Sequence, residues 1–330
     1  MRKTIQFLKY RYIAFGFSIV LLVLFIAGSV MKGGLNMGVD FVGGVKLIVD
    51  FPKDVKEKDI KDTLKGLNPI VQKLGSESKN EFMISIKLKE QKKKNESKNK
   101  TNKKIDLKEK VEIKTDTVGN KTEQKKEVMT KEAQESEKIK KLLVTRFKNI
   151  EIVSVENVGP AIGDFLKNSA IKLFLVALVL MMLYLTFRFE FKYSMGAMAA
   201  LVHDLSLTVV FCGFMGVEIN IPVIAALLTI FGYSVNDTIV IFDRIRENVQ
   251  VKAKSTFLDT INKSITLSIS RTLLTSLTTL FAVLSLYLIG GEGLNEFALV
   301  LLFGIFVGTY SSVYIASPLL VKWEQMFSKG

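Results

Sequence analysis

The sequence contains few of the side chains that build metal sites and disulfides. Its 330 residues include one cysteine, Cys212, and one histidine, His203. A single cysteine forms no intrachain disulfide, and one Cys with one His cannot build a closed zinc site. No nucleophile, base and oxyanion donors recur at a recognisable spacing. We therefore expect no metal, no other cofactor and no enzymatic activity.

Hydrophobic residues make up 48% of the chain and are gathered in long blocks, while the charged residues lie between them. About 20 apolar residues in a helix cross the hydrocarbon core of a bilayer. Six windows of that kind are present, at 12–31, 170–187, 195–217, 221–242, 265–289 and 297–321. The composition therefore predicts an α-helical polytopic membrane protein with six spans.

Basic residues are absent from two short loops, 217–221 and 290–296. The segments at the opposite ends of the spans carry Arg2, Lys3, Lys9, Arg11, Arg188, Lys192, Arg244, Arg246, Lys252, Lys254, Lys263, Lys322 and Lys329. Because short cytoplasmic segments are enriched in Lys and Arg, we expect both termini to be cytoplasmic.

This orientation divides the chain into four parts. We expect a cytoplasmic start and first span at 1–31, an extracytoplasmic domain at 32–168, spans two to six at 169–323, and a cytoplasmic tail at 324–330.

Alternating and helical patterns in the extracytoplasmic part predict strands at 45–51, 70–74, 81–88 and 150–157, with helices at 55–66 and 135–148. This βαββαβ order predicts an α+β ferredoxin-like domain. Between them, 89–132 is dominated by Lys, Glu, Asn, Thr and Gln, and we expect a disordered insertion there. It is either a solvated insertion or an electrostatic contact with lipid headgroups or a partner.

Ionisable residues within the spans are the candidate functional groups, because a charge in hydrocarbon is costly. Asp237 lies six positions before the end of the fourth span at Asp243, roughly 9 Å in. Arg271 lies at a similar depth in the fifth span, and Asp204 lies nine positions into the third. We expect these three to form a polar cluster.

Further polar side chains in the same spans, Asn236, Thr275 and Thr278, are predicted to support this cluster. Two interpretations of the acid and base stay open, a proton relay or a structural buried ion pair. The hydroxyl groups either carry water or hold neighbouring helices together.

Five motifs in order resemble those of the SecF proteins of the SecD/SecF family, in the RND superfamily. They are GVDFVGG at 38–44, VGPAIG at 158–163, HD at 203–204, YSVNDTIVIFDRIREN at 233–248 and SRTLLTSLTT at 270–279. The resemblance covers the whole chain apart from the Lys-rich insertion. It implies a six-span RND-type half-bundle with a domain after the first span.

The resemblance also implies a function and partners. It implies an accessory subunit of the Sec protein-export machinery in the bacterial inner membrane, acting with a separate SecD chain near the SecYEG channel and YajC. Such a subunit uses the proton-motive force to promote translocation and release of unfolded polypeptides, amid membrane lipid and without nucleic acid.

Two alternatives stay open. One is an RND-type exporter subunit for small molecules or lipids, and the other is a non-transporting membrane assembly scaffold.

Overall fold

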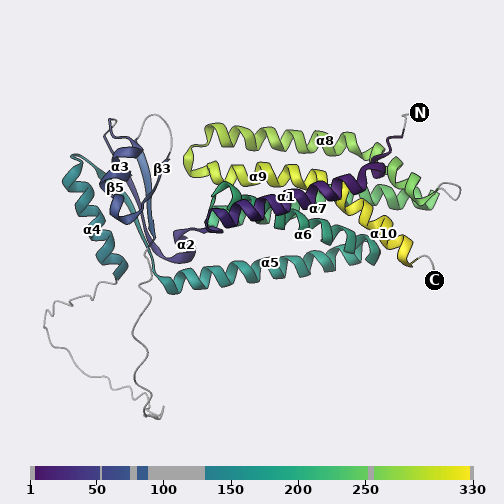
Figure 1. The fold of residues 1–330 in the computed structure, drawn as a ribbon, viewed down its shortest axis with the longest axis horizontal. Helices are drawn as coiled ribbons and strands as arrows, with labels where there is room; N and C mark the ends of the chain where they lie inside the picture. The colour runs from purple at the N-terminus through teal and green to yellow at the C-terminus, as the bar shows by residue number, and fades with distance from the viewer. Residues whose placement is uncertain (1–3, 53, 75–79, 88–130, 252–255, 328–330) are drawn as a thin grey trace, which may run out of the picture.

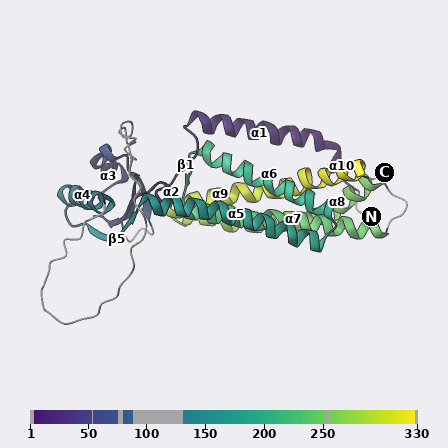
Figure 2. The ribbon, with the colours of Figure 1, turned by 90° about the horizontal axis from the view of Figure 1, so that it is seen from below.

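The computed structural model describes residues 4–52, 54–74, 80–87, 131–251 and 256–327. A small α/β domain lies at one end of a bundle of long helices, and both termini lie at the other end (Figure 1). Figure 2 shows α1 beside α6 along one side of this bundle.

Six helical segments are long and apolar enough to cross a membrane, by length and composition. They are Phe7–Met31, Pro160–Arg188, Phe191–Met215, Ile221–Gln250, Phe257–Ile289 and Gly293–Met326. The first joins a short 3-10 turn, η1 (Phe7–Tyr10), to α1 (Arg11–Met31). The next four are α5 (Pro160–Arg188), α6 (Phe191–Met215), α7 (Ile221–Val251) and α8 (Phe257–Ile289). The six predicted spans are confirmed, and most helices extend beyond the predicted windows.

The last segment is not a uniform helix. It consists of α9 (Glu292–Ser311), a π-helical turn η3 (Ser312–Ala316), and α10 (Ser317–Phe327). π-helical turns inside longer helices are rare and often lie at functional sites. Here the turn directly follows Ser311, one of the residues of the polar network described below.

The α/β domain has the predicted βαββαβ order. Its elements are β2 (Gly44–Asp50), α3 (Glu57–Thr63), β3 (Ile70–Leu74), β4 (Glu81–Lys87), α4 (Lys131–Arg146) and β5 (Glu151–Val158), with a 3-10 turn η2 (Lys65–Leu67) after α3. The sheet is antiparallel with the order β3-β4-β2-β5. This is the strand order of a ferredoxin-like fold, so the predicted fold class is confirmed. Most of the predicted insertion at 89–132 lies outside the described residues, and α4 begins at Lys131.

One face of this sheet forms the core of the domain with the two helices. Alternate residues of β2 and β4, among them Leu47 and Ile84, are fully buried against Ile60 of α3 and Ile139 and Leu143 of α4. Burying such a side chain contributes about 1.5–3 kcal/mol. The alternation that predicted the strands is thus the alternation that fills this core.

The domain is joined to the bundle by short elements. β1 (Asn36–Met37) pairs in parallel with β6 (Glu218–Ile219), which lies between α6 and α7. A short helix, α2 (Val39–Val42), then leads into β2. Gly44 at that entry has φ +155°, and a Cβ there would lie 2.2 Å from the Ile86 carbonyl oxygen, so the close approach of β2 to β4 requires glycine.

Candidate functional site

Asp237 lies on the buried face of α7, in the middle of the bundle. Its side chain is 2% exposed, and its Oδ2 accepts a hydrogen bond from the Ser276 hydroxyl on α8 at 3.2 Å. Ser276 Oγ also lies 2.8 Å from Thr309 Oγ1 on α9. Three helices therefore contribute to the surroundings of this one carboxyl group, and its contacting side chain is a hydroxyl rather than a cation.

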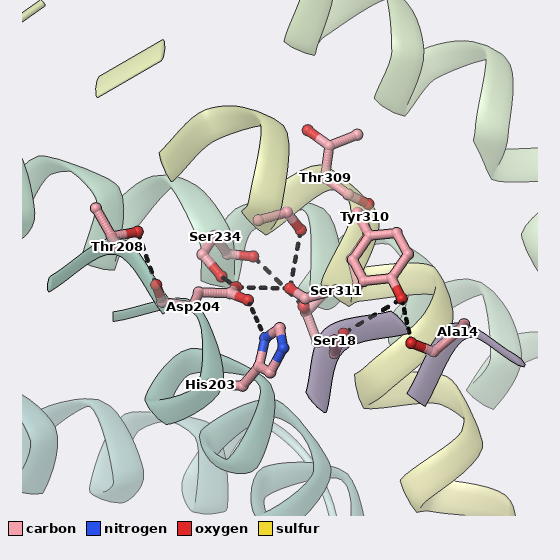
Figure 3. A network of polar contacts seen from close by, with 12 residues as sticks. Ala14, Ser18, His203, Asp204, Thr208, Ser234, Thr309, Tyr310 and Ser311 are labelled. Carbon is pink, nitrogen blue, oxygen red and sulfur yellow. Dashed lines mark hydrogen bonds and ion pairs between the residues drawn. The ribbon is translucent and has the colours of Figure 1, made fainter. Parts of the chain in front are cut away.

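A second buried carboxyl group, Asp204 on α6, is the centre of a larger network (Figure 3). It is fully buried, and its Oδ2 accepts hydrogen bonds from Ser311 of α9 at 2.5 Å and from Ser234 of α7. Its Oδ1 lies 2.9 Å from Nδ1 of His203, the preceding residue on the same helix. The carboxyl group therefore has a polar partner on each oxygen.

Side chains of α7 and α9 take part in both acid sites. On α7, Ser234 lies three positions before Asp237, so both side chains point to one face of that helix. On α9, Thr309 lies beside the Asp237 group and Ser311 in the Asp204 group. The polar side chains therefore form a layer across α6, α7, α8 and α9 within an otherwise apolar bundle.

Tyr310 extends the polar contacts to the first span (Figure 3). Its hydroxyl donates to the Ala14 carbonyl oxygen at 2.7 Å and accepts from the Ser18 hydroxyl at 3.3 Å. These bonds hold α1 against α9 next to the Asp204 network.

Arg271 is not brought into contact with Asp237. The described residues contain no ion pair between the two, and the positive charge of Arg271 acts on the carboxyl group only at longer range. Arg271 is exposed on α8, whereas Thr272 and Ser276 are buried. The argument from depth concerns only position along the helix axis, whereas Ser276, five residues further along α8, points about 140° away from Arg271.

The predicted supporting residues lie on outer surfaces too. Asn236 of α7 is exposed, as are Thr275 and Thr278 of α8. The Thr275 hydroxyl donates to the Arg271 carbonyl oxygen at 3.1 Å, and Thr278 donates to that of Leu274 at 3.0 Å, both on their own helix. The expected three-residue cluster is therefore not assembled within this chain, although Asp204 and Asp237 are both in the bundle core.

Three of the hydroxyl residues that complete the two acid sites were not singled out from the sequence: Ser234, Thr309 and Ser311. The fourth, Ser276, was among the hydroxyls of the fifth span that were expected to carry water or bind a neighbouring helix. The available signal was spacing, because Ser234 lies at i−3 from Asp237 on the same helix. No comparable local signal connects Thr309 and Ser311 to acids on other helices.

A third polar group lies where the α/β domain meets the bundle. Asp40 Oδ2 accepts the Ile221 backbone N–H at the start of α7 at 3.0 Å, and its Oδ1 pairs with Lys46 Nζ at 3.0 Å. Glu218 Oε1 lies 3.4 Å from Lys87 Nζ, and Glu296 accepts the Glu218 N–H at 3.0 Å. These contacts connect the domain to the starts of α7 and α9 and to β6 between α6 and α7.

Known proteins share this arrangement of sequence and fold. The model of the family described as "Protein export membrane protein SecD/SecF, C-terminal" matches residues 138–326. The chain belongs to the SecD/SecF family. The protein translocase subunit SecF of Vibrio alginolyticus is 36% identical over 323 residues, which are 97% of this chain and 90% of that protein. That of Borreliella burgdorferi is 35% identical over 98% of both chains.

A solved structure of a SecD/SecF family member has the same fold. The crystal structure of SecDF from Thermus thermophilus, described as a translocon-associated membrane protein, matches with a TM-score of 0.74 and 29% sequence identity. The match covers 98% of this chain and 39% of that SecDF chain. Membership of the SecD/SecF family and six apolar helices identify this chain as a multi-pass inner-membrane protein.

Proposed function

We propose that this chain is a SecF-type subunit of a Sec protein-export machinery, with a transport role rather than an enzymatic one. It acts with a separate SecD chain and uses the proton-motive force to promote translocation and release of precursor polypeptides. Support comes from relatives named protein translocase subunit SecF that match along nearly the whole chain. The proton-driven part rests on the buried acids.

The hydrogen-bonding surroundings of Asp237 support the proposal of proton coupling. A serine hydroxyl donates to a carboxylate and accepts from a protonated carboxylic acid. Ser276 therefore provides a hydrogen-bonding partner for both protonation states of Asp237. A permanent ion pair with Arg271 would instead hold the group in its charged form.

The exposed polar face of α8 supports a partner within the membrane. Arg271, Thr275 and Thr278 are exposed on a helix long enough to span the bilayer, and an arginine facing lipid there is costly. The chain matches only 39% of SecDF. We therefore propose that the six-span half of SecD covers this face and that Arg271 acts at the boundary between the two halves.

The proposed contacts with the SecYEG channel and YajC follow from the orientation of this chain in the membrane. The excess of Lys and Arg at one end of the bundle supports cytoplasmic termini, which makes the α/β domain extracytoplasmic. In this position the domain meets polypeptide leaving the SecYEG channel, with YajC as a further neighbour in the membrane.

A complementation experiment tests the proposed function. A bacterial strain depleted of its own SecF would express this chain with its cognate SecD, and precursor accumulation would be followed by pulse labelling. We expect the wild-type chain to restore export and the Asp237→Asn variant, at equal abundance, to restore little. Undiminished precursor accumulation with the wild-type chain and its SecD would contradict an export role.

Cysteine labelling tests the proposed SecD contact. Thr275→Cys would be reacted with a lipid-soluble maleimide with and without SecD, and Leu175→Cys on the exposed face of α5 serves as the control. We expect SecD to protect position 275 at least severalfold more than position 175. Equal labelling of position 275 with and without SecD would exclude this face as the contact.

A further inference from the structure

Residues of α1 and α10 line a basic groove. The start of α1 lies with α10 at the end of the bundle where both termini lie (Figure 1). The volume of the groove is about 440 Å³. The polar part of its lining consists of Arg11, Tyr12, Lys322 and Gln325, and Phe15 and Leu319 are part of its apolar wall. Both helices belong to spanning segments, so the groove opens at a membrane surface.

The two cations of this groove, Arg11 and Lys322, have no acidic partner among the described residues. Arg188 and Arg244 at the same end of the bundle differ, because Arg188 pairs with Asp243 at 3.1 Å and Arg244 pairs with Glu247 at 2.8 Å. The groove therefore presents two positive charges to whatever occupies it.

Arg11 is also oriented by its neighbour. Its guanidinium carbon lies 4.8 Å from the centre of the Tyr12 ring, and its Nη2 donates to the Tyr12 hydroxyl at 3.3 Å. An arginine held in this way presents its remaining N–H groups in the fixed fork that suits phosphate oxygens.

The groove continues as an apolar channel along α1. A second hollow, of about 220 Å³, shares Phe15 and Leu319 with the first. Its lining includes Ile19 and Leu22 of α1, and Ala199 and His203 of α6. From Arg11 to Leu22 the helix rises about 16 Å. That length matches the half of a bilayer core that one lipid leaflet fills, about 15 Å.

The geometry points to a binding site for one acidic phospholipid in this groove. Arg11 and Lys322 hold the phosphate of the headgroup, and one acyl chain lies along Phe15, Ile19 and Leu22. The combination of two unpaired cations with an apolar channel of leaflet length favours a lipid over a free phosphate. His203 is part of the channel lining, so the bound chain contacts the ring whose Nδ1 lies 2.9 Å from Asp204.

Native mass spectrometry of the full chain in detergent tests this site, by titration with phosphatidylglycerol and with phosphatidylcholine. We expect phosphatidylglycerol to bind about tenfold more tightly, a preference that the Arg11→Gln/Lys322→Gln variant loses. The Arg188→Gln/Arg244→Gln variant removes the same charge at the same end of the bundle and should keep the preference. Equal affinity of the wild type for both lipids, or an unchanged preference in the first variant, would overturn the proposal.

The apolar channel is tested separately. Ala199 is exposed and lines the channel, so Ala199→Phe fills it without entering the protein core. We expect this variant to bind phosphatidylglycerol at least severalfold more weakly, while inorganic phosphate binds wild type and variant equally weakly. Unchanged lipid binding by Ala199→Phe, or inorganic phosphate competing as strongly as the lipid, would identify a free-phosphate site and refute a lipid site. The melting temperature of each variant checks that it is folded.

Discussion

The Ser276 hydroxyl on α8 donates a hydrogen bond to Asp237 Oδ2 on α7, across 3.2 Å in the middle of the bundle. This bond joins the candidate proton-carrying acid to a neighbouring helix. A relative movement of α7 and α8 would therefore change the surroundings of the carboxyl group, which is the physical requirement for coupling protonation to a change of shape.

Replacing Ser276 with alanine should weaken gradient-dependent export. The change removes one hydrogen bond to Asp237, a contribution of about 1.5–3 kcal/mol when the acceptor is charged. We expect a reduction of about fivefold or more in the gradient-stimulated rate of translocation into membrane vesicles. Ser285→Ala is the matched control, because the exposed Ser285 hydroxyl bonds only to the Ala282 carbonyl oxygen of its own helix. Equal rates in the two variants would remove Ser276 from the mechanism.

Ser311→Ala should destabilise the protein, because Ser311 is one of two hydroxyl donors to the fully buried Asp204 Oδ2. The expected loss is about 1–3 kcal/mol. Ser312→Ala provides the comparison, since the Ser312 hydroxyl donates to the Thr309 carbonyl oxygen within the same segment. Thermal unfolding in detergent should give a lower midpoint for Ser311→Ala than for Ser312→Ala. The reverse order would contradict a structural role for the Asp204 network.

The Glu218 carboxyl group at the junction should make stability depend on pH. Burial raises its pKa above the usual value near 4.3, and this effect exceeds the opposing attraction of Lys87. Lys46 also acts on it and lowers its pKa, Asp40 raises it, and Glu218 in turn interacts electrostatically with the neighbouring Glu296. Because the pKa is higher in the folded state, protonated Glu218 favours folding. That contribution is complete below the unfolded pKa and is lost as the pH rises through the folded pKa.

Glu218→Gln isolates this effect, because the amide keeps the shape of the side chain but does not titrate. We expect wild type to lose stability relative to Glu218→Gln as the pH rises across that interval, with a constant difference above it. Thermal midpoints at a series of pH values provide the measurement. A difference that stays constant from acid to neutral pH would show that Glu218 is not perturbed by burial.

Gly44→Ala should destabilise the α/β domain. A Cβ at this position would lie 2.2 Å from the Ile86 carbonyl oxygen, and the backbone has φ +155°. A strained backbone of this kind costs about 1–3 kcal/mol before the clash is relieved. Gly66→Ala is the control, because nothing lies within 4 Å of the added Cβ. Urea unfolding of the two variants, followed by a signal from the α/β domain, provides the measurement. Similar urea midpoints for the two variants would contradict the close approach of β2 to β4.

The fold was predictable because its signals are local. Long apolar windows fix the spanning helices, and strand alternation such as that of β2 fixes which residues enter the domain core. The ends of the helices were less predictable. The fourth span was predicted to end at Phe242, but α7 runs to Val251. The charged residues that follow Phe242 continue the helix.

The site was predictable only in part. A buried acid such as Asp237 is visible in a sequence because it interrupts an apolar run, but its partners come from other helices. Rotation about the helix axis decides those partners, and five residues separate the outward Arg271 from the inward Ser276. The parallel pairing of β1 with β6 was hidden for another reason, because two residues on each side carry no periodic pattern.

The most direct test of the central claim is the Asp237→Asn variant in inverted membrane vesicles with the cognate SecD, with and without a proton gradient. Asp243→Asn is the matched control, because Asp243 lies on the same helix, but its side chain is 42% exposed and pairs with Arg188. We predict that Asp237→Asn abolishes the gradient-dependent part of precursor translocation and spares the rest, while Asp243→Asn translocates like wild type. Full gradient stimulation in the Asp237→Asn vesicles would contradict Asp237 as the coupling acid.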